Sequence, residues 1–372
     1  MAKLDVTMRD YVLETPKTVL ENVKNSKQLT QSLVDLYTKK NYRKIIIVAS
    51  GSSCNATTMA KELMMHYLDV DVKIVTPFTF TNYEFNVEED DFVICVSQSG
   101  CSTNTIDALR KCKEMNIPTI GLTGNPNSDF KTEADVVIDY GVGEELVGYV
   151  TKGVVTLTLF FMLFALEVAL ATNKASEEGI NSRKNEIMKA MDAHKEMVDA
   201  FDKFYLEHKK ILTSMSNLYA ISCGANYGTI MEAALKIGET VHVPAVQYEV
   251  DEYIHGPNYQ LTPNYTVILV DGGDEAGKRC VQAYHATRTI TDKCFIITNN
   301  ESITENVIRI PSAVSEMLSP LYNVVFFQLL SYHVSDELKS LRRHPLFSNF
   351  ETKISAKSES YVDSHNLIIG EE

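Results

Sequence analysis

Residues 92–102 read Phe-Val-Ile-Cys-Val-Ser-Gln-Ser-Gly-Cys-Ser, and this stretch decides the fold. An apolar run that breaks into a hydroxyl-rich turn is typical of a strand buried on both faces that leads into a helix. The helix is indicated by Ile106, Leu109 and Cys112, which recur at helical spacing. The sequence therefore predicts one strand–turn–helix unit of a parallel sheet.

The turn of this unit suits a phosphate group. It carries the hydroxyls of Ser97, Ser99, Ser102 and Thr103, together with a glycine, at the point where the helix begins. The first N–H groups of a helix are unpaired and lie at the positive end of its dipole, so they attract an anion. Hydroxyls add hydrogen-bond donors with little bulk.

A second copy of this design precedes the first. Residues 45–48 are an apolar run, residues 49–53 read Ala-Ser-Gly-Ser-Ser, and an amphipathic helix follows. In open α/β sheets, ligands bind at the carboxyl ends of the strands, where two neighbouring turns would converge. Serine and glycine also serve simply as helix caps and turn residues, which is the alternative interpretation. The hydroxyl density of two adjacent turns favours a bound phosphate.

The composition is that of a globular protein long enough for two domains. The chain has 372 residues and a net charge of −14, so the basic face that a nucleic acid needs is not expected. Its seven cysteines form no CxxC pair and lie mostly in apolar runs, which indicates buried, reduced thiols. The nine histidines show no HxH or HExxH grouping, so neither a metal nor another cofactor is expected. The N-terminus shows no secretion signal, and a cytoplasmic location is expected.

Along the chain, β-rich runs alternate with helical runs, which predicts a parallel, doubly wound sheet. The strands expected in the first half are 44–49, 72–76, 92–96, 118–122 and 135–139. The pattern then restarts, with strands expected at 218–222, 266–270, 293–297 and 306–310 and a helix at 320–340.

The fold class expected is therefore α/β, with two similar lobes in tandem, each a five-stranded parallel sheet flanked by helices. The expected division is N-terminal helices over 1–40, a first domain over 41–170, a helical connector over 171–210, a second domain over 211–340 and a tail over 341–372.

Residues 154–170 are apolar nearly all round. A membrane span is one interpretation, but the run is short and contains Thr156, Thr158 and Glu167. A helix buried between two domains or subunits is the favoured interpretation.

The second half holds three charged residues at helical spacing. Glu232, Lys236 and Glu239 are four and three positions apart, so they can share one face of a helix, where they could form no more than a solvated ladder of ion pairs. His255 follows in a turn before a Gly-Pro pair. A carboxylate and a histidine at one site could remove a carbon-bound proton beside a carbonyl or imine and move protons among sugar oxygens.

Four motifs resemble the SIS (sugar isomerase) domain family. They are Ser50-Gly51-Ser52-Ser53-Cys54-Asn55, Val96-Ser97-Gln98-Ser99-Gly100-Cys101-Ser102-Thr103-Asn104-Thr105, Glu232-Ala233-Ala234-Leu235-Lys236-Ile237-Gly238-Glu239 and His255-Gly256-Pro257. The chain is most similar to the tandem-SIS branch, which includes the isomerase half of glutamine–fructose-6-phosphate amidotransferase and the fructosamine and glucoselysine 6-phosphate deglycases. The resemblance covers residues 20–355.

The resemblance implies a role for each matching position. The residues that would hold the sugar phosphate are Ser53, Ser97, Gln98, Ser99 and Ser102, with Gly51 and Ser52 beside the substrate. Glu239 would act as the base at C1 and C2, and Lys236 would contact the sugar. His255 would assist proton transfer from the neighbouring subunit. A homodimer with shared sites follows from the same resemblance.

The chain departs from the family pattern in three places. Val150 stands where the family has a hydroxyl that contacts the sugar. The synthase tail carries a lysine that forms an imine with the keto sugar, and Lys353 is its approximate match here. The chain begins Met-Ala-Lys, without the N-terminal cysteine of a glutaminase domain, so release of ammonia from glutamine is not expected.

The resemblance implies an enzyme that cleaves a sugar–amine 6-phosphate of the fructosamine 6-phosphate type into a hexose 6-phosphate and an amine. Two alternative enzymes are an ammonia-dependent glucosamine-6-phosphate isomerase or deaminase and a phosphosugar aldose–ketose isomerase. An alternative of another class is a phosphosugar sensor without turnover, which would not need a base at Glu239. The partner expected is a small phosphosugar, with no nucleic acid and no membrane.

Overall fold

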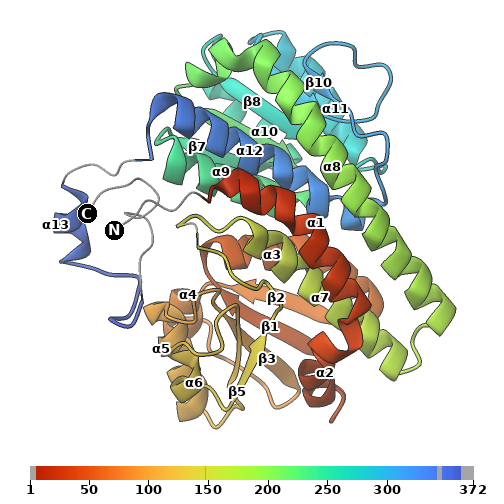
Figure 1. Ribbon diagram of the computed structural model, residues 1–372, viewed down its shortest axis with the longest axis vertical. Coiled ribbons are helices and arrows are strands. Elements are labelled where there is room, and N and C mark those ends of the chain that lie inside the picture. Colours follow the sequence, from red (N-terminus) through yellow and green to blue (C-terminus); the bar gives the residue numbers. More distant parts are fainter. Residues whose placement is uncertain (1–5, 147, 342–345, 362–372) are drawn as a thin grey trace. The chain divides into compact units, whose positions relative to one another are not determined.

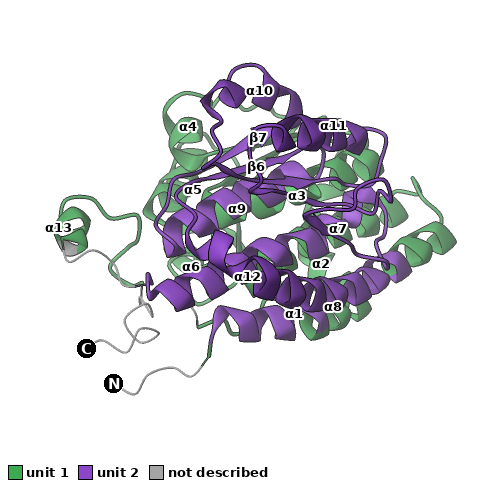
Figure 2. Ribbon diagram, turned by 90° about the horizontal axis from the view of Figure 1, so that it is seen from above, with its two compact units in different colours: residues 1–6, 17–184, 343–372 green, residues 7–16, 185–342 purple. Residues whose placement is uncertain are grey.

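The computed structural model of the chain describes residues 6–146, 148–341 and 346–361. The chain divides into two compact units, which are drawn in different colours in Figure 2. Unit 1 comprises residues 1–6, 17–184 and 343–372, and unit 2 comprises residues 7–16 and 185–342. Two helices precede the first strand, α1 (Met8–Lys24) and α2 (Ser26–Tyr37).

Unit 1 contains a five-stranded parallel sheet with the strand order β2-β1-β3-β4-β5. Its strands are β1 (Lys44–Ala49), β2 (Asp71–Val75), β3 (Asp91–Val96), β4 (Ile120–Thr123) and β5 (Val136–Asp139). Its further helices are α3 (Gly51–Leu68), α4 (Pro77–Asn82), α5 (Thr103–Glu114), α6 (Phe130–Glu133), α7 (Lys152–Ala171) and α13 (Phe347–Glu351). All five strands expected in the first half are confirmed, with ends that differ by at most two residues.

Helices cover both faces of this sheet. Figure 1 shows α4, α5 and α6 on one side of it and α2 and α7 on the other. On the first side, the helices pack on the sheet through one hydrophobic cluster. In it, Phe80, Leu109 and Phe130 of the helices pack with alternate side chains of the strands. Successive strand residues point to opposite faces of the sheet, so the unbroken apolar run of residues 92–96, which is buried throughout, contributes side chains to both faces.

The register of the two central strands fixes where their turns begin. Strands β1 and β3 are neighbours, and Ala49 at the end of β1 pairs with Val96 at the end of β3. Ser50 and Ser97, which follow these residues, therefore start their turns at the same carboxyl edge of the sheet. This confirms the expectation that the two hydroxyl-rich turns belong to adjacent strands.

The apolar segment forms α7, which is buried nearly all round. Among the described residues it is the one helix long and apolar enough to cross a membrane by length and composition. Within unit 1 it packs against α3 and α2. A core helix passes the same hydropathy test as a membrane span, and the burial of α7 favours a buried helix over a span.

Unit 2 repeats the topology of unit 1. Its strands are β6 (Leu218–Ser222), β7 (Ala245–Glu249), β8 (Thr266–Val270), β9 (Cys294–Ile297) and β10 (Val307–Ile308). They are parallel, in the order β10-β9-β8-β6-β7. When this order is read from the β7 edge, the second strand of the unit comes first, followed by the first, third, fourth and fifth strands. This is the same order as in unit 1. The structure confirms the α/β class with two parallel five-stranded sheets.

The helices of unit 2 include a long one, α8 (Glu177–Thr213), which begins within unit 1. The others are α9 (Asn226–Thr240), α10 (Val250–Ile254), α11 (Gly277–Arg288) and α12 (Pro320–Leu338), with short 3₁₀ turns at Pro257–Gln260 and Glu316–Leu318. Helices α9 and α12 pack side by side. Phe201 and Phe204 of α8 stack edgewise on Phe326 and Phe295, which anchors α8 to the sheet core.

One strand of unit 2 was not expected from the sequence. Strand β7 lies at an edge of the sheet and its side chains are mostly half-exposed, so it lacks the apolar run that marks the central strands. The last strand, β10, is two residues long, shorter than the run expected at 306–310. All seven cysteines carry free thiols and five of them are buried, as expected.

Candidate functional site

Two turns meet at the carboxyl edge of the first sheet, where the sequence predicts a phosphate site. Helix α3 starts at Gly51, whose φ of 55° lies in the left-handed region that glycine tolerates, and Ser52 and Ser53 follow in its first turn. Helix α5 starts after Ser102. Asn104 Nδ2 donates a hydrogen bond to Ser50 Oγ over 3.0 Å, so the two turns are joined directly.

The β3–α5 turn is folded tightly around Gly100. This residue has a φ of 64°, and a Cβ atom there would lie 1.8 Å from Ser128 Oγ. Only glycine therefore fits. Ser97 is buried and its hydroxyl donates to Ser102 Oγ over 3.0 Å, while the backbone N–H of Cys101 donates to Ser99 Oγ over 3.3 Å. The structure thus brings Ser97, Ser99 and Ser102 together, as the sequence predicts.

Gln98 faces a different partner from its neighbours. Its Nε2 donates to Glu145 Oε2 over 2.6 Å, and a Cβ atom at Gly153 would lie 2.7 Å from the same nitrogen. The side-chain donor of Gln98 is therefore used inside the protein. Its backbone carbonyl accepts from Gly124 N and Thr123 Oγ1, which ties the turn to β4.

Glu145 was not singled out in the sequence, yet it organises this edge. Its carboxylate also accepts the N–H groups of Thr151, Lys152 and Gly153 over 2.6–3.1 Å, at the beginning of α7. Burial raises the pKa of Glu145, while these hydrogen bonds oppose the rise. A lone glutamate in a Gly-rich loop gives no sequence signal, because its partners are backbone groups that only the fold assembles.

A lysine of the C-terminal segment reaches the β3–α5 turn. Lys357 Nζ donates to Ser99 Oγ over 3.0 Å and to Ser102 Oγ over 3.2 Å. Lys353, the tail lysine singled out from the sequence, is exposed, and its backbone N–H bonds to Phe350 O. The structure therefore places Lys357, four residues later, at the position next to the predicted phosphate ligands. Its surroundings, Ser355-Ala356-Lys357-Ser358, give no sequence signal for this position, because its partners lie in a distant segment of the chain.

Helix α9 of unit 2 carries the predicted charged triad. Lys236 Nζ lies 3.4 Å from Glu232 Oε1 and 2.7 Å from Glu239 Oε2. The side chains of Glu232 and Lys236 are 0% and 1% exposed, whereas that of Glu239 is 35% exposed. The solvated ladder left open by the sequence is therefore wrong for this triad. Two charges are fully buried and one carboxylate reaches the surface.

The charge balance of the triad holds Lys236 protonated. Burial acts to lower the pKa of Lys236, but the two carboxylates, Glu239 and Glu232, outweigh it and the pKa is raised. An ammonium that stays charged between two carboxylates orients both of them. Glu239 is thus a positioned carboxylate at the last turn of α9.

His255 lies at the end of α10, on a different element from the triad. Its side chain is exposed, and Nδ1 donates to Asp251 O over 2.7 Å. Because a carbonyl oxygen only accepts, this bond assigns the proton to Nδ1 and leaves Nε2 as the acceptor of the neutral ring. No described hydrogen bond or ion pair links His255 to Glu239.

In unit 2, the side chain of Glu316 occupies the corresponding turn. Strand β6 leads into α9 as β1 leads into α3, but here Glu316 Oε1 accepts the N–H of Ala225 over 2.8 Å. A Cβ atom at Gly272 would lie 2.5 Å from Glu316 Cγ, so this carboxylate is tightly seated. The second sheet thus supplies its own anion to the turn that follows its first strand.

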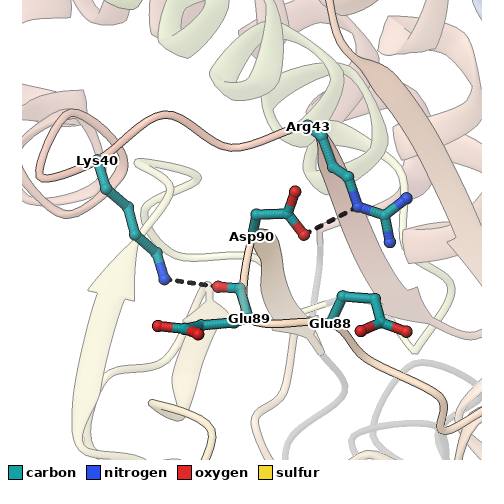
Figure 3. A pocket seen from close by; sticks show the side chains of 5 residues that line it. All are labelled: Lys40, Arg43, Glu88, Glu89 and Asp90. Carbon is teal, nitrogen blue, oxygen red and sulfur yellow. Dashed lines mark hydrogen bonds and ion pairs between the residues drawn. The ribbon is translucent and has the colours of Figure 1, made fainter.

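A pocket of about 640 Å³ lies away from these turns, at the opposite edge of the first sheet (Figure 3). It is lined by Lys40, Arg43, Glu88, Glu89 and Asp90, which precede β1 and β3. Arg43 Nε is paired with Asp90 Oδ1 at 2.9 Å. All five side chains are charged and exposed, so the pocket lacks the hydroxyl cluster of the predicted site. In the described ranges, no group of three or more His, Cys, Asp or Glu residues could hold a metal ion.

Comparison with known proteins gives a consistent result. The model of the SIS domain family matches residues 37–166. A glutamine–fructose-6-phosphate aminotransferase (isomerizing) of Thermococcus kodakarensis is 25% identical over 333 residues, 88% of this chain and 54% of that protein. The human glutamine–fructose-6-phosphate aminotransferase (isomerizing) 2 is 24% identical over 346 residues, 88% of this chain and 49% of that protein. The chain thus spans about half the length of the curated relatives it matches.

Solved structures agree with the fold. A Clostridium difficile protein provisionally assigned as a phosphosugar isomerase superposes with a TM-score of 0.85 and 25% identity, over 95% of this chain and 99% of that one. The C-terminal domain of glucosamine-fructose-6-phosphate aminotransferase from Francisella tularensis superposes with a TM-score of 0.78 and 22% identity, over 90% of this chain and 96% of that one.

The fold and the matched region define the class: this is an α/β protein with a SIS domain in its first half. More particularly, the chain is homologous to the isomerase half of the glutamine–fructose-6-phosphate aminotransferases, and its structural neighbours are of the phosphosugar isomerase type.

Proposed function

We propose that the protein is a phosphosugar enzyme that cleaves a fructosamine 6-phosphate-type substrate into a hexose 6-phosphate and an amine. The observation that carries the proposal is the hydroxyl cluster of Ser97, Ser99 and Ser102 at the beginning of α5, joined through Asn104 to the first turn of α3. The site residues proposed there are Ser53, Ser97, Ser99 and Ser102 for the phosphate, with Gly51 and Ser52 beside the sugar. Gln98 would position the turn through Glu145.

The chemistry proposed is a proton transfer between C1 and C2. Glu239 removes the proton from C1, which carries the amine, while His255 in its doubly protonated form delivers the Nε2 proton to the C2 oxygen. Glu239 returns its proton to C2 of the resulting enaminol, and the nitrogen gives its own proton back to Nε2 of His255, which leaves an imine between C1 and nitrogen. Water adds to this imine, the C1–nitrogen bond breaks, and the amine leaves with a proton. The non-reacting phosphate anchors the far end of the open-chain sugar, so its binding energy orients the reacting carbons.

The charged triad supports a base at position 239. Glu239 is the member whose carboxylate reaches the surface, and Lys236 holds it in one orientation. Binding a phosphosugar without turnover would not require a positioned carboxylate. This feature favours an enzyme over a sensor. The sensor stays as the second candidate, because hydroxyl turns alone suffice for binding.

A substrate panel tests the proposal. The wild-type chain is mixed with fructoselysine 6-phosphate, with glucosamine 6-phosphate, and with fructose 6-phosphate plus ammonia, and the products are measured by mass spectrometry. Release of lysine and a hexose 6-phosphate from the first substrate supports the deglycase. Turnover of only the second or third mixture identifies a deaminase or isomerase instead. Binding of hexose phosphates with no product from any mixture identifies a sensor and overturns the proposal.

Two features of the setting belong to the same proposal. The protein would act in the cytoplasm, where reduced thiols persist, and all seven of its cysteines are free. It would act as a homodimer in which His255 serves the site of the neighbouring subunit, and its exposed position is compatible with that role. Mixing inactive Glu239→Gln and His255→Ala chains tests sharing, since activity in the mixed dimer requires residues from both subunits at one site.

A further inference from the structure

The C-terminal segment lies across the predicted phosphate turn as a strap, residues 355–361. Ser358 N donates to Cys101 O over 2.9 Å, and Thr103 N donates to Ala356 O over 3.1 Å. Ser102 and Lys357 form an antiparallel bridge between these bonds. Ser360 Oγ also donates to Asp129 Oδ1 over 2.6 Å. The strap is therefore attached by backbone bonds on both sides of Ser102.

The strap delivers one ammonium group to the hydroxyl cluster. Lys357 Nζ lies 3.0 Å from Ser99 Oγ and 3.2 Å from Ser102 Oγ, and 4.9 Å from the centre of the Tyr361 ring. An ammonium can only donate, so both hydroxyls accept from it. Ser99 also accepts from Cys101 N and Ser102 also accepts from Ser97. Each of the two hydroxyls therefore keeps its own proton for another acceptor.

A second observation points to a missing polar partner at this turn. Ser128 is 8% exposed, and its Oγ has no hydrogen-bond partner in the described protein. This oxygen lies against Gly100 at the centre of the turn. Buried hydroxyls without a partner are uncommon in proteins, because losing water without a replacement is costly. The turn thus combines donors held ready with a hydroxyl that lacks its partner.

We propose that Lys357 is the cationic ligand of the substrate phosphate and that a bound phosphate holds the strap in the place it occupies here. This inference rests on the function proposed above. The serine hydroxyls and helix N–H groups carry no formal charge, and the whole chain has a net charge of −14. A phosphate that accepts from Ser99 and Ser102 would lie beside the ammonium, and this pairing supplies the missing positive charge. The carbonyl of Ala356 in the strap accepts the N–H of Thr103, so this N–H is not available to the phosphate. In its place, the strap brings the positive charge of Lys357 to the turn.

The opposite arrangement would be a plug, in which Lys357 occupies the place of the phosphate. The two arrangements predict opposite effects of a bound phosphate on the strap. A phosphate would displace a plug, whereas it would hold a strap that supplies its cation. The geometry favours Lys357 as a ligand of the phosphate. The ammonium donates hydrogen bonds to Ser99 and Ser102, so the hydroxyl protons of both serines can still be donated to an anion.

The test compares Lys357→Met with the matched control Lys27→Met, which changes an exposed lysine of the same unit. Fructose 6-phosphate is titrated into each full-length chain by calorimetry at pH 8, and fructose serves as the blank. We expect the control to bind like wild type and Lys357→Met to bind about ten- to a hundred-fold more weakly, as for a hydrogen bond to a charged group. The loss of affinity caused by Lys357→Met should be smaller at pH 5, where the phosphate carries about one negative charge fewer.

The outcomes separate the two proposals. Absence of fructose 6-phosphate binding to wild type overturns the proposed function together with this inference. Binding by wild type that is unchanged in Lys357→Met overturns this inference alone, and tighter binding identifies a plug. If Lys357→Met does not fold, trypsin decides with wild type: fructose 6-phosphate should slow cleavage after Lys357 several-fold. Unchanged or faster cleavage overturns the inference.

Discussion

The ammonium nitrogen of Lys236 lies 2.7 Å from the Oε2 atom of Glu239, at the last turn of α9. The lysine is buried and the carboxylate is partly exposed, so the pair points from the interior of unit 2 toward its surface. Such a pair fixes the direction of a carboxylate without covering it. This is the arrangement that a base acting on a small substrate needs.

Glu239→Gln removes the base and keeps the shape of the side chain. We expect kcat to fall by about 10²–10⁴, the contribution typical of a positioned acid or base, while KM changes little. Steady-state kinetics with fructoselysine 6-phosphate measures both constants. Glu275→Gln, an exposed glutamate that pairs with Lys278 in the same unit, is the control and should keep full activity. Near wild-type turnover in Glu239→Gln contradicts the assignment.

Lys236→Met breaks the buried pair and leaves Glu232 uncompensated in the interior. Removing one partner of a buried ion pair typically costs about 3–5 kcal/mol. Urea unfolding should therefore show a lower midpoint for this variant, and unit 2 should lose its structure first. Lys278→Met removes a lysine from an exposed pair and should leave the midpoint unchanged. An equal effect of the two substitutions would show that the burial of Lys236 carries no energetic weight.

Each chain should bind one hexose phosphate. The β6–α9 turn of unit 2 is occupied by Glu316, whose carboxylate takes the N–H of Ala225. A phosphate would have to displace this carboxylate against charge repulsion, so the second turn is closed to anions. Native mass spectrometry with fructose 6-phosphate should give a ratio of one ligand to one chain. A ratio of two in wild type, reduced to one by Ser99→Ala, would contradict this.

His194 should make the stability of unit 2 depend on pH. The residue is buried between the carbonyls of Val12 and Leu321, and burial lowers its pKa to about 4 from 6.5. The unfolded chain binds the proton more readily than the folded one, so stability is full above pH 6.5 and is lost as the pH falls toward 4. The loss amounts to about 3 kcal/mol over this window.

Urea midpoints measured from pH 7 to pH 4 test this slope. His194→Gln removes the titrating group, so its midpoint should fall less steeply than that of wild type, whatever its absolute stability. His66→Gln replaces an exposed histidine of unit 1 and should keep the wild-type slope. Parallel slopes for wild type and His194→Gln would rule out this contribution.

Much of the fold could be predicted because central parallel strands are buried on both faces and therefore read as unbroken apolar runs. The run before Ser97 is the clearest case. Edge strand β7 escaped because its side chains are mostly half-exposed, and its sequence shows no apolar run. The elements that shape the phosphate turn from a distance escaped for another reason. Glu145 acts through backbone N–H groups and Lys357 arrives from a distant segment, so neither has a local pattern.

The candidate site divides in the same way. The serines of the turns and the spacing of the α9 triad could be predicted from local sequence, but the burial of Glu232 and Lys236 could not. Their spacing suits an exposed face equally well, and only the packing of α9 against α12 decides between the two. The orientation of Gln98 toward Glu145 likewise depends on Gly153, which is 55 positions away along the chain.

The two sheets share one strand order, yet the turn after the leading strand is open to an anion in one and sealed by Glu316 in the other. The two halves of the chain are therefore suited to different tasks despite their common topology. The first half offers a turn that can grip an anion, whereas the second half, whose own turn is closed by Glu316, carries the charged triad of α9.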